Sequence, residues 1–426
     1  MITNKKNVQI CNGVNFTCIP NEKFKTSSIS FTMFLPLKED MVSKNAIFPN
    51  LLEHSCERYP SLTALNKKLA DLYGASVIAG VDKIGDFQVL TISISCINDK
   101  FALDDEKIIF ESANLLCDLI FHPVLENGKF RESDILQEKR QLIETIDSEY
   151  NDKRVYSKLR CEQLMCKNEK YGINKYGTKE QVEALSSEDV YYAWKNALET
   201  AQIEIMMIGN NDYGLIVKRF QDEFKNINRE NARKIQTEVI RSCEKHNEYK
   251  DMMELKQSKL VMGFRTGIAL PDDEVPAMRL MTALLGGTPS SKLFLNVREK
   301  MSLCYYCSSN YNKNKGIMLI ESGVEHKNIE AAKGAILNQI EQIKDGDFSD
   351  EQLESTKRYL SQMFEKVNDS ISSLDDWYVL QSINEKINTP EQAIEEINKV
   401  NREDVINAAK KLTLDTIYIL TSKEEN

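Results

Sequence analysis

The feature that most constrains the fold is an internal repeat. A predicted helix followed by a buried strand in residues 186–210 has a counterpart in residues 401–423, where Asp404 takes the place of Asp189. Each copy follows two amphipathic helices with apolar residues at helical spacing, and these follow an alternating strand. Because self-similarity of this kind fixes the architecture of a chain, the sequence predicts two halves of one design. The other matched pieces are the strands 87–96 and 316–325, the helices 106–123 and 327–346, and the helices 135–146 and 353–364.

Both halves open on a strand that leads through a polar loop into a helix, at 46–58 in the first half and 276–286 in the second. The strands are short, alternating and mostly hairpin-linked. This pattern favours an α+β fold in which each half has a largely antiparallel sheet with helices packed on one face. A polar, charge-rich stretch separates the halves, which predicts an N-terminal domain at 1–225, a linker at 226–246 and a C-terminal domain at 247–426.

The charge of the chain excludes some classes of partner. At 426 residues it is long enough for two or three domains, and its net charge is −10. Nucleic acids and anionic membranes both need a basic face, so neither is an expected partner. There is no signal-peptide pattern at the N-terminus and no run near the ~18 apolar residues of a membrane span. We therefore expect a cytoplasmic protein.

The ten cysteines are scattered and are expected to be reduced and mostly buried. Cys304 and Cys307 form a C-x-x-C sequence. The surrounding stretch is a predicted strand, however, in which residues i and i+3 face opposite sides. The pattern therefore does not favour a redox or metal role for this pair.

Residues 50–54 read NLLEH, one residue away from HLLEH. Two histidines at i and i+4 of a helix can bind zinc, with the glutamate between them as general base. Here Asn50 stands where the first histidine would be. Taken alone, the stretch also fits an ordinary, partly buried amphipathic helix in which Glu53 and His54 form hydrogen bonds with neighbouring groups.

Two similar α+β halves, with this motif on an early helix of the first, resemble the inverzincin peptidases, which include pitrilysin, insulinase and the mitochondrial processing peptidase. The likeness covers nearly the whole chain and is strongest to bacterial single-unit members that work as pairs. It implies that the two halves face each other as a clamshell. Further matching stretches are residues 69–80, 176–190, 282–309 and 348–360.

The resemblance implies a broken zinc site. Asn50 occupies the position of the first histidine, Glu53 matches the catalytic base and His54 matches the second zinc ligand. The third ligand in the family is a glutamate at the end of a motif on a later helix. Laid over this sequence, the first glutamate of that motif falls on Glu138 and the ligand position falls on Thr145.

Ligand chemistry then argues against bound metal. An amide and a hydroxyl are poor zinc ligands, and a catalytic zinc needs about three anionic or imidazole donors. Glu144 lies about 100° around the helix from Thr145, and Cys56 does not share a helix face with His54, so neither is expected to rescue the site. We expect no metal or cofactor in this chain, and zinc in a partner subunit instead.

The second half retains a different set of residues. The stretch LNVREKMSLCYYCSS is similar to a family segment in which an arginine and a tyrosine contact the substrate, and these fall on Arg298 and Tyr305. Ser302 departs from the glycine that is usual there, and a shift of one residue would turn Tyr306 inward instead. The structural alternatives are an arginine paired with Glu299 and a packed strand aromatic.

A glycine pair precedes this segment. Gly286 and Gly287 resemble the glycine-rich loop of the family and are expected to let the chain turn sharply near the substrate. No Lys-Ser/Thr follows them, so the pattern does not favour a nucleotide site.

These observations predict a non-catalytic subunit of a zinc-peptidase-like pair. Arg298 and Tyr305 would complement the zinc site of a homologous partner that cleaves a peptide or an unfolded protein. Whether the chain pairs with that homologue or with a second copy of itself stays open. The alternatives are a structural or peptide-binding scaffold of the same fold, and a peptidase that is active through unusual ligands.

Overall fold

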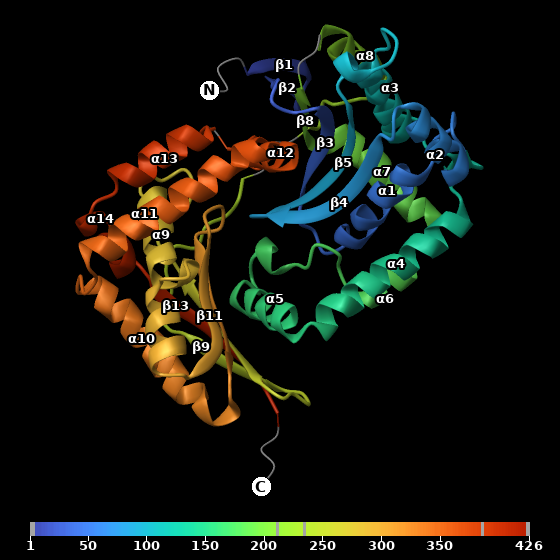
Figure 1. Cartoon of the computed structure of the whole chain (residues 1–426). Coiled ribbons are helices and arrows are strands. Elements are labelled where there is room, and N and C mark those ends of the chain that lie inside the picture. The colour runs from blue at the N-terminus through green and yellow to red at the C-terminus, as the bar shows by residue number, and fades with distance from the viewer. Residues whose placement is uncertain (1–4, 210–212, 233–235, 385–386, 423–426) are drawn as a thin grey trace. The chain divides into compact units, whose positions relative to one another are not determined.

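The computed structural model describes residues 5–209, 213–232, 236–384 and 387–422. The chain forms two compact units (Figure 1). They differ from the domain ranges expected from the sequence, because each unit takes a segment from the other half of the chain. Unit 1 consists of Met1–Asp147, Ile173–Gln236 and Asp369–Ile383, and unit 2 consists of Ser148–Gly172, Thr237–Asn368 and Asn384–Asn426.

The main sheet of unit 1 has the strand order β1-β2-β8-β3-β5-β4. All its neighbouring strands are antiparallel except β2 and β8, which are parallel. The largely antiparallel sheet predicted for the first half is thus confirmed. The strands are β1 (Lys6–Cys11), β2 (Val14–Pro20), β3 (Thr26–Pro36), β4 (Ser76–Ile84), β5 (Phe87–Ile97) and β8 (Gln202–Gly209), and a separate hairpin is formed by β6 (Leu125–Glu126) and β7 (Lys129–Phe130).

Helices cover both faces of this sheet, which Figure 1 shows, so the expectation of helices on one face alone is wrong. Phe31 of β3 points into the main core, where it packs against aromatic rings of α3 and α8. Its neighbour Ser30 points to the opposite face and donates a hydrogen bond of 2.7 Å to Asp375 of α12. The helices of this unit are α1 (Val42–His54), α2 (Leu62–Asp71), α3 (Ile108–Phe121), α4 (Glu132–Asn151), α6 (Lys179–Ala184), α7 (Ser187–Thr200), α8 (Gly214–Phe224) and α12 (Ile371–Val379).

The sheet of unit 2 has the order β11-β12-β10-β13-β9. Its neighbours are antiparallel except β13 and β9. The resulting plan matches that of unit 1, as the repeat predicts. The strands are β9 (Asn247–Met252), β10 (Ser258–Arg265), β11 (Cys304–Asn312), β12 (Ile317–Val324) and β13 (Thr413–Thr421).

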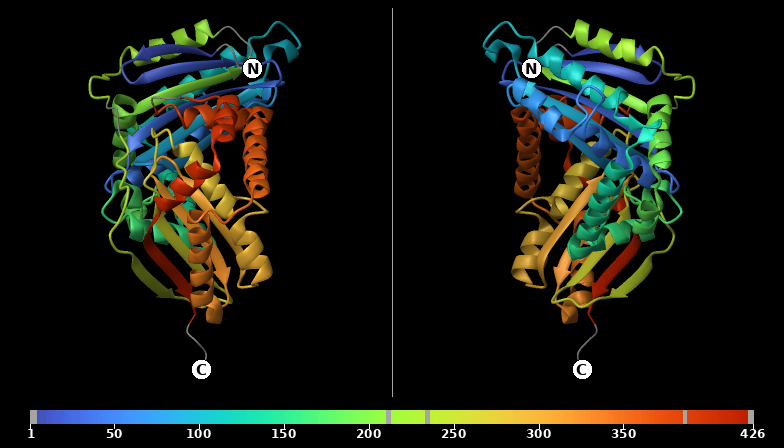
Figure 2. Two further views of the ribbon diagram at one scale, coloured as in Figure 1. Left: turned by 90° about the vertical axis from the view of Figure 1, so that its left-hand side faces the viewer. Right: turned by 90° about the vertical axis from the view of Figure 1, so that its right-hand side faces the viewer.

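One helix again lies on the second face of the sheet. Val261 and Gly263 of β10 face α5, and a Cβ atom on Gly263 would approach the sulfur of Met165 to 2.7 Å. The other helices lie on the opposite face, and in the left view of Figure 2 the orange helix α10 stands in front of the strands. The helices are α5 (Lys153–Met165), α9 (Val275–Thr282), α10 (Ile329–Lys344), α11 (Asp350–Glu365), α13 (Pro390–Lys399) and α14 (Arg402–Lys410), with π-helical turns at Ala283–Gly287 and Leu293–Lys300.

A buried ionic network holds the segment after α5 against the sheet of unit 2. Arg265 donates to Glu169 and to Asp415, both at 2.7 Å. Lys315 forms an ion pair of 2.8 Å with the second oxygen of Glu169. Charges this far from water are stable only when they are paired, so the network ties Ser148–Gly172 to unit 2.

The strand β11 departs from the regular geometry expected of it. Cys304 lies opposite Val324 and Tyr306 lies opposite Gly323, so two steps on β11 match one step on β12. Tyr305 is the extra residue of this β-bulge. Cys307 then lies opposite Ser322. The expectation that Cys304 and Cys307 face opposite sides is therefore wrong, because the inserted residue reverses the alternation.

All ten cysteines lie among the described residues and are free thiols in the structure. Within the described part of the chain, every helix is too short or too polar to span a bilayer.

Candidate functional site

The NLLEH stretch forms the last turn of α1, a helix that begins and ends four residues earlier than expected, at Val42 and His54. Asn50 and His54 are at i and i+4 and so lie on the same face of the helix. The sequence therefore placed this motif correctly on a helix. Asn50 is half-buried there.

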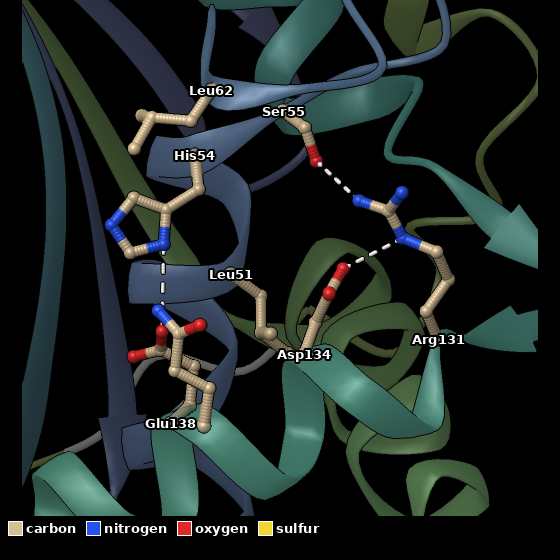
Figure 3. Close-up of a pocket in the computed structure, with 8 residues that line it drawn as sticks. Leu51, His54, Ser55, Leu62, Arg131, Asp134 and Glu138 are labelled. Carbon is tan, nitrogen blue, oxygen red and sulfur yellow. Dashed lines mark hydrogen bonds and ion pairs between the residues drawn. The ribbon is translucent and has the colours of Figure 1, made fainter.

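His54 has a carboxylate partner on α4. Its Nδ1 lies 3.4 Å from Oε1 of Glu138, whose side chain is only 2% exposed. The hydrogen bond from His54 to this carboxylate raises the pKa of the imidazole. Figure 3 shows the ring of His54 pointing toward Glu138. The second oxygen of Glu138 is buried and has no hydrogen-bond partner among the described residues.

Glu53 has a structural role. Its Oε2 accepts a hydrogen bond of 3.0 Å from the backbone N–H of Ala79. Ala79 lies on β4, the edge strand of the sheet, so the carboxylate satisfies a donor that no further strand can pair. Burial raises the pKa of Glu53. Both Glu53 and His54 thus have the neighbouring partners that the structural interpretation of this helix predicts.

The residue at the expected third ligand position is not suited to bind zinc. Thr145 is exposed, and its hydroxyl donates 3.0 Å to the carbonyl of Gln141 in the same helix. Glu144 is exposed on α4, whereas Cys56 is fully buried with a pKa raised by that burial. The described ranges contain no cluster of three or more His, Cys, Asp or Glu that could hold a metal ion. The donors present do not fit a catalytic zinc.

A pocket of about 160 Å³ lies beside His54. Arg131 lines it and is held by Asp134 at 2.7 Å and by the hydroxyl of Ser55 at 3.4 Å. Figure 3 shows these side chains turned toward one another rather than toward His54. The pocket can hold a few waters or a small polar group. The lining residues are Leu51, His54, Ser55, Leu62, Arg131, Asp134, Gln137 and Glu138.

Arg298 of unit 2 lies on the π-helical turn Leu293–Lys300. Its guanidinium stacks 4.5 Å over the ring of Phe294, and its Nε lies 3.5 Å from the carboxylate of Glu299. The contact with Glu299 is the one that the structural alternative predicts. The side chain is nevertheless 39% exposed, and a surface ion pair of this length is weak. Arg298 is therefore accessible to a ligand.

The bulge in β11 decides which tyrosine is exposed. Tyr305 is 61% exposed. Tyr306 is half-buried, with the Arg154 guanidinium 4.4 Å above its ring, and burial raises its pKa to about 12. Of the two alternatives left open by the sequence, Tyr305 is thus the more exposed side chain.

The glycine pair precedes this segment in the π-helical turn Ala283–Gly287. A Cβ on Gly286 would lie 2.7 Å from the backbone nitrogen of Ser309. That distance is too short for any side chain, so Gly286 is required by its packing against β11. The predicted sharp turn is not the reason for this glycine. Gly287 has room for a Cβ, since its nearest neighbour would be at 3.4 Å.

The fold has two repeated α+β units and an Asn-x-x-Glu-His helix whose His54 pairs with Glu138 of α4. These features define the class of the protein as an inverzincin-type metallopeptidase fold. Residues 184–360 match the family described as Peptidase M16 inactive domain. The chain is 33% identical to the probable inactive metalloprotease YmfF of Bacillus subtilis, over 97% of this chain and 96% of the relative. The chain belongs to the M16 peptidase family.

The chain is also similar to two further proteins. A crystal structure of a conserved protein from Enterococcus faecalis has a TM-score of 0.92 and 28% identity, with complete coverage of both chains. An uncharacterized zinc protease of Bacillus subtilis, YmxG, is 25% identical over 75% of this chain and 78% of its own length. The lost zinc ligands and the M16 inactive-domain match make this chain a metallopeptidase-like pseudoenzyme.

Proposed function

We propose that the chain is the zinc-less subunit of a peptidase pair, and that it supplies Arg298 and Tyr305 to the zinc site of a homologous partner. One observation carries this proposal. The chain has lost the donors that a zinc needs but keeps an arginine and a tyrosine whose side chains are both accessible. A peptidase can tolerate loss of the first set if the metal belongs to another subunit.

The chemistry of the pair suits peptide cleavage. A guanidinium offers a planar fork of donors that can hold a peptide carbonyl or a carboxylate. A phenol can donate a hydrogen bond to the oxyanion that develops as water attacks the scissile carbonyl. Arg298 would therefore orient the substrate, and Tyr305 would stabilise the charge. The zinc that activates the water would be held by the partner.

The test is complementation in a purified complex. The chain is mixed with a zinc-bearing M16 homologue from the same organism, and cleavage of an unfolded protein and of short peptides is measured. We expect activity only when both subunits are present. Tyr305→Phe should reduce kcat about 10²- to 10³-fold, the usual cost of removing one oxyanion donor, and Arg298→Ala should mainly raise KM.

The neighbouring residue provides a matched control. Tyr306→Phe makes the same chemical change on a half-buried ring and should leave the activity within about twofold, while size-exclusion chromatography confirms that every complex is intact. A structural or peptide-binding scaffold is the second candidate. It would give equal activity with wild-type chain, Arg298→Ala and Tyr305→Phe, and that result would refute the proposed role.

A further inference from the structure

The bulge in β11 places the side chains of Cys304 and Cys307 on one face. Their partners on β12, Val324 and Ser322, are two residues apart, and residues two apart on a regular strand share a face. The positions of Cys304 and Cys307 are thus roughly 7 Å apart along the strand. Three residues of a regular strand would separate them by roughly 10 Å. A separation of roughly 7 Å is at the upper end of what a disulfide bridges.

The two thiols are in contact. The pKa of each thiol is shifted chiefly by its interaction with the other, which places the two sulfurs next to each other on this face. The hydroxyl of Ser322, opposite Cys307, donates a hydrogen bond of 3.0 Å to the carbonyl of Tyr306. Their residues are 8% and 5% exposed, respectively. Both cysteines are thus buried, and Cys304 lies next in the chain to the exposed Tyr305.

The surroundings shift the pKa values of the two thiols in opposite directions. The interaction with Cys307, with smaller contributions from Ser322 and the positive charge of Arg298, lowers the pKa of Cys304 although burial opposes it. The same interaction and burial raise the pKa of Cys307. In contrast, burial raises the pKa of Cys96 to about 11. Cys304 is therefore the more acidic of the two thiols, and the thiolate is the reactive form.

We propose that Cys304 and Cys307 are a redox-active pair that a hydroperoxide oxidises to a reversible disulfide. The Cys304 thiolate attacks one peroxide oxygen, the O–O bond breaks, and the alkoxide that leaves takes up a proton, which gives an alcohol and a sulfenic acid on Cys304. The Cys307 sulfur then attacks the Cys304 sulfur, and the hydroxyl leaves as water with the proton of Cys307. Two thiols lose two hydrogens, and the peroxide accepts two electrons.

The disulfide would fix the bulge, since both sulfurs flank the inserted Tyr305. Whether this changes peptide cleavage rests on the proposed function, but disulfide formation does not. The test therefore uses the full chain alone, without a partner subunit.

The purified chain is treated with hydrogen peroxide at pH 7, remaining thiols are alkylated, and the peptides are analysed by mass spectrometry. We expect a peptide that links Cys304 to Cys307 and is lighter by two hydrogens, and its reversal by dithiothreitol. Because its pKa is lowered, Cys304 should react faster at pH 7 than N-acetylcysteine, whose thiol is almost fully protonated. The rate should rise with pH as the Cys304 thiol ionises, with an inflection below that of N-acetylcysteine.

Single substitutions distinguish the roles of the two cysteines. Cys307→Ser should stop the reaction at a sulfenic acid on Cys304, which dimedone traps, whereas Cys304→Ser should leave no fast-reacting thiol in this segment. Cys243→Ser, at a half-buried cysteine elsewhere in unit 2, should change neither result. If the wild-type chain keeps Cys304 and Cys307 as thiols while other cysteines oxidise, the proposal is wrong, whatever the variants do.

Discussion

His54 has a buried carboxylate partner, although the other two zinc ligands of the family's motif are absent. Because the hydrogen bond to Glu138 raises the pKa of His54, the pair stabilises the fold fully below about pH 6.5 and loses this contribution as the pH rises through the raised pKa. Glu138→Gln should lower the pKa of His54 toward its ordinary value of 6.5. Histidine NMR titration checks this in a chain with four histidines, and Glu144→Gln on the same helix should have no effect.

Glu204 on β8 is a second titrating residue, buried and hydrogen-bonded to Thr17. Burial raises its pKa from 4.5 to about 7. Between these values the folded chain holds a proton that the unfolded chain has released, so the free energy of unfolding falls as the pH rises. Glu204→Gln should remove its part of this dependence, which is worth about 3 kcal/mol at most. Asp375, whose pKa burial also raises to about 7, accounts for the slope that remains.

Urea unfolding at a series of pH values from 4 to 8 measures the effect of Glu204→Gln. Glu199→Gln, at an exposed position of unit 1, is the control and should follow the wild-type profile. A variant profile as steep as the wild-type one would show that another group titrates.

At the scale of elements, the alternation of apolar residues predicted most strands and helices, because each depends on a local period. The β-bulge was not predicted, since one inserted residue leaves the composition and spacing of the strand unchanged. The sequence therefore placed Cys304 and Cys307 on opposite faces. The sequence also did not show which of Tyr305 and Tyr306 is the exposed residue, because their orientation depends on the same inserted residue. The packing of α5 and α12 on the second face of each sheet depends on tertiary contacts and likewise left no local pattern.

The network around Glu169 gives a prediction at this scale. Glu169→Gln removes the negative charge that Arg265 and Lys315 share, and breaking a buried pair costs about 3–5 kcal/mol. We expect a loss of that size in the free energy of unfolding, measured with urea. Glu325→Gln, which removes the exposed partner of Lys327 in the same unit, should cost less than about 1 kcal/mol.

At the scale of the whole molecule, the repeat predicted two α+β units of one plan, and the fold and the M16 family confirm it. The partner subunit, the roles of Arg298 and Tyr305 and the cytoplasmic location stay predictions, because they depend on a second protein and on the cell. The sequence could identify the lost zinc ligands, since donor chemistry is a property of residue type. It could not show that Glu138 would pair with His54, because that contact joins two helices far apart in the chain.

Metal content tests the pseudoenzyme interpretation directly. The purified chain should bind far less than one zinc per molecule after dialysis against micromolar zinc, measured by inductively coupled plasma mass spectrometry, because His54 is the one strong donor left among the motif positions. His54→Ala should not change the content. Stoichiometric zinc that disappears in His54→Ala would instead revive a peptidase with unusual ligands.

The exchange of α5 and α12 between the two halves of the sequence has a consequence for how such a chain can be divided. A gene split at residues 226–246 would encode two fragments that each lack a helix of their own sheet and carry one that belongs to the other. We expect neither fragment to be a complete folding unit, so the boundary between the repeats is not a place where the chain can be divided, even though the repeat suggests an ancestral duplication.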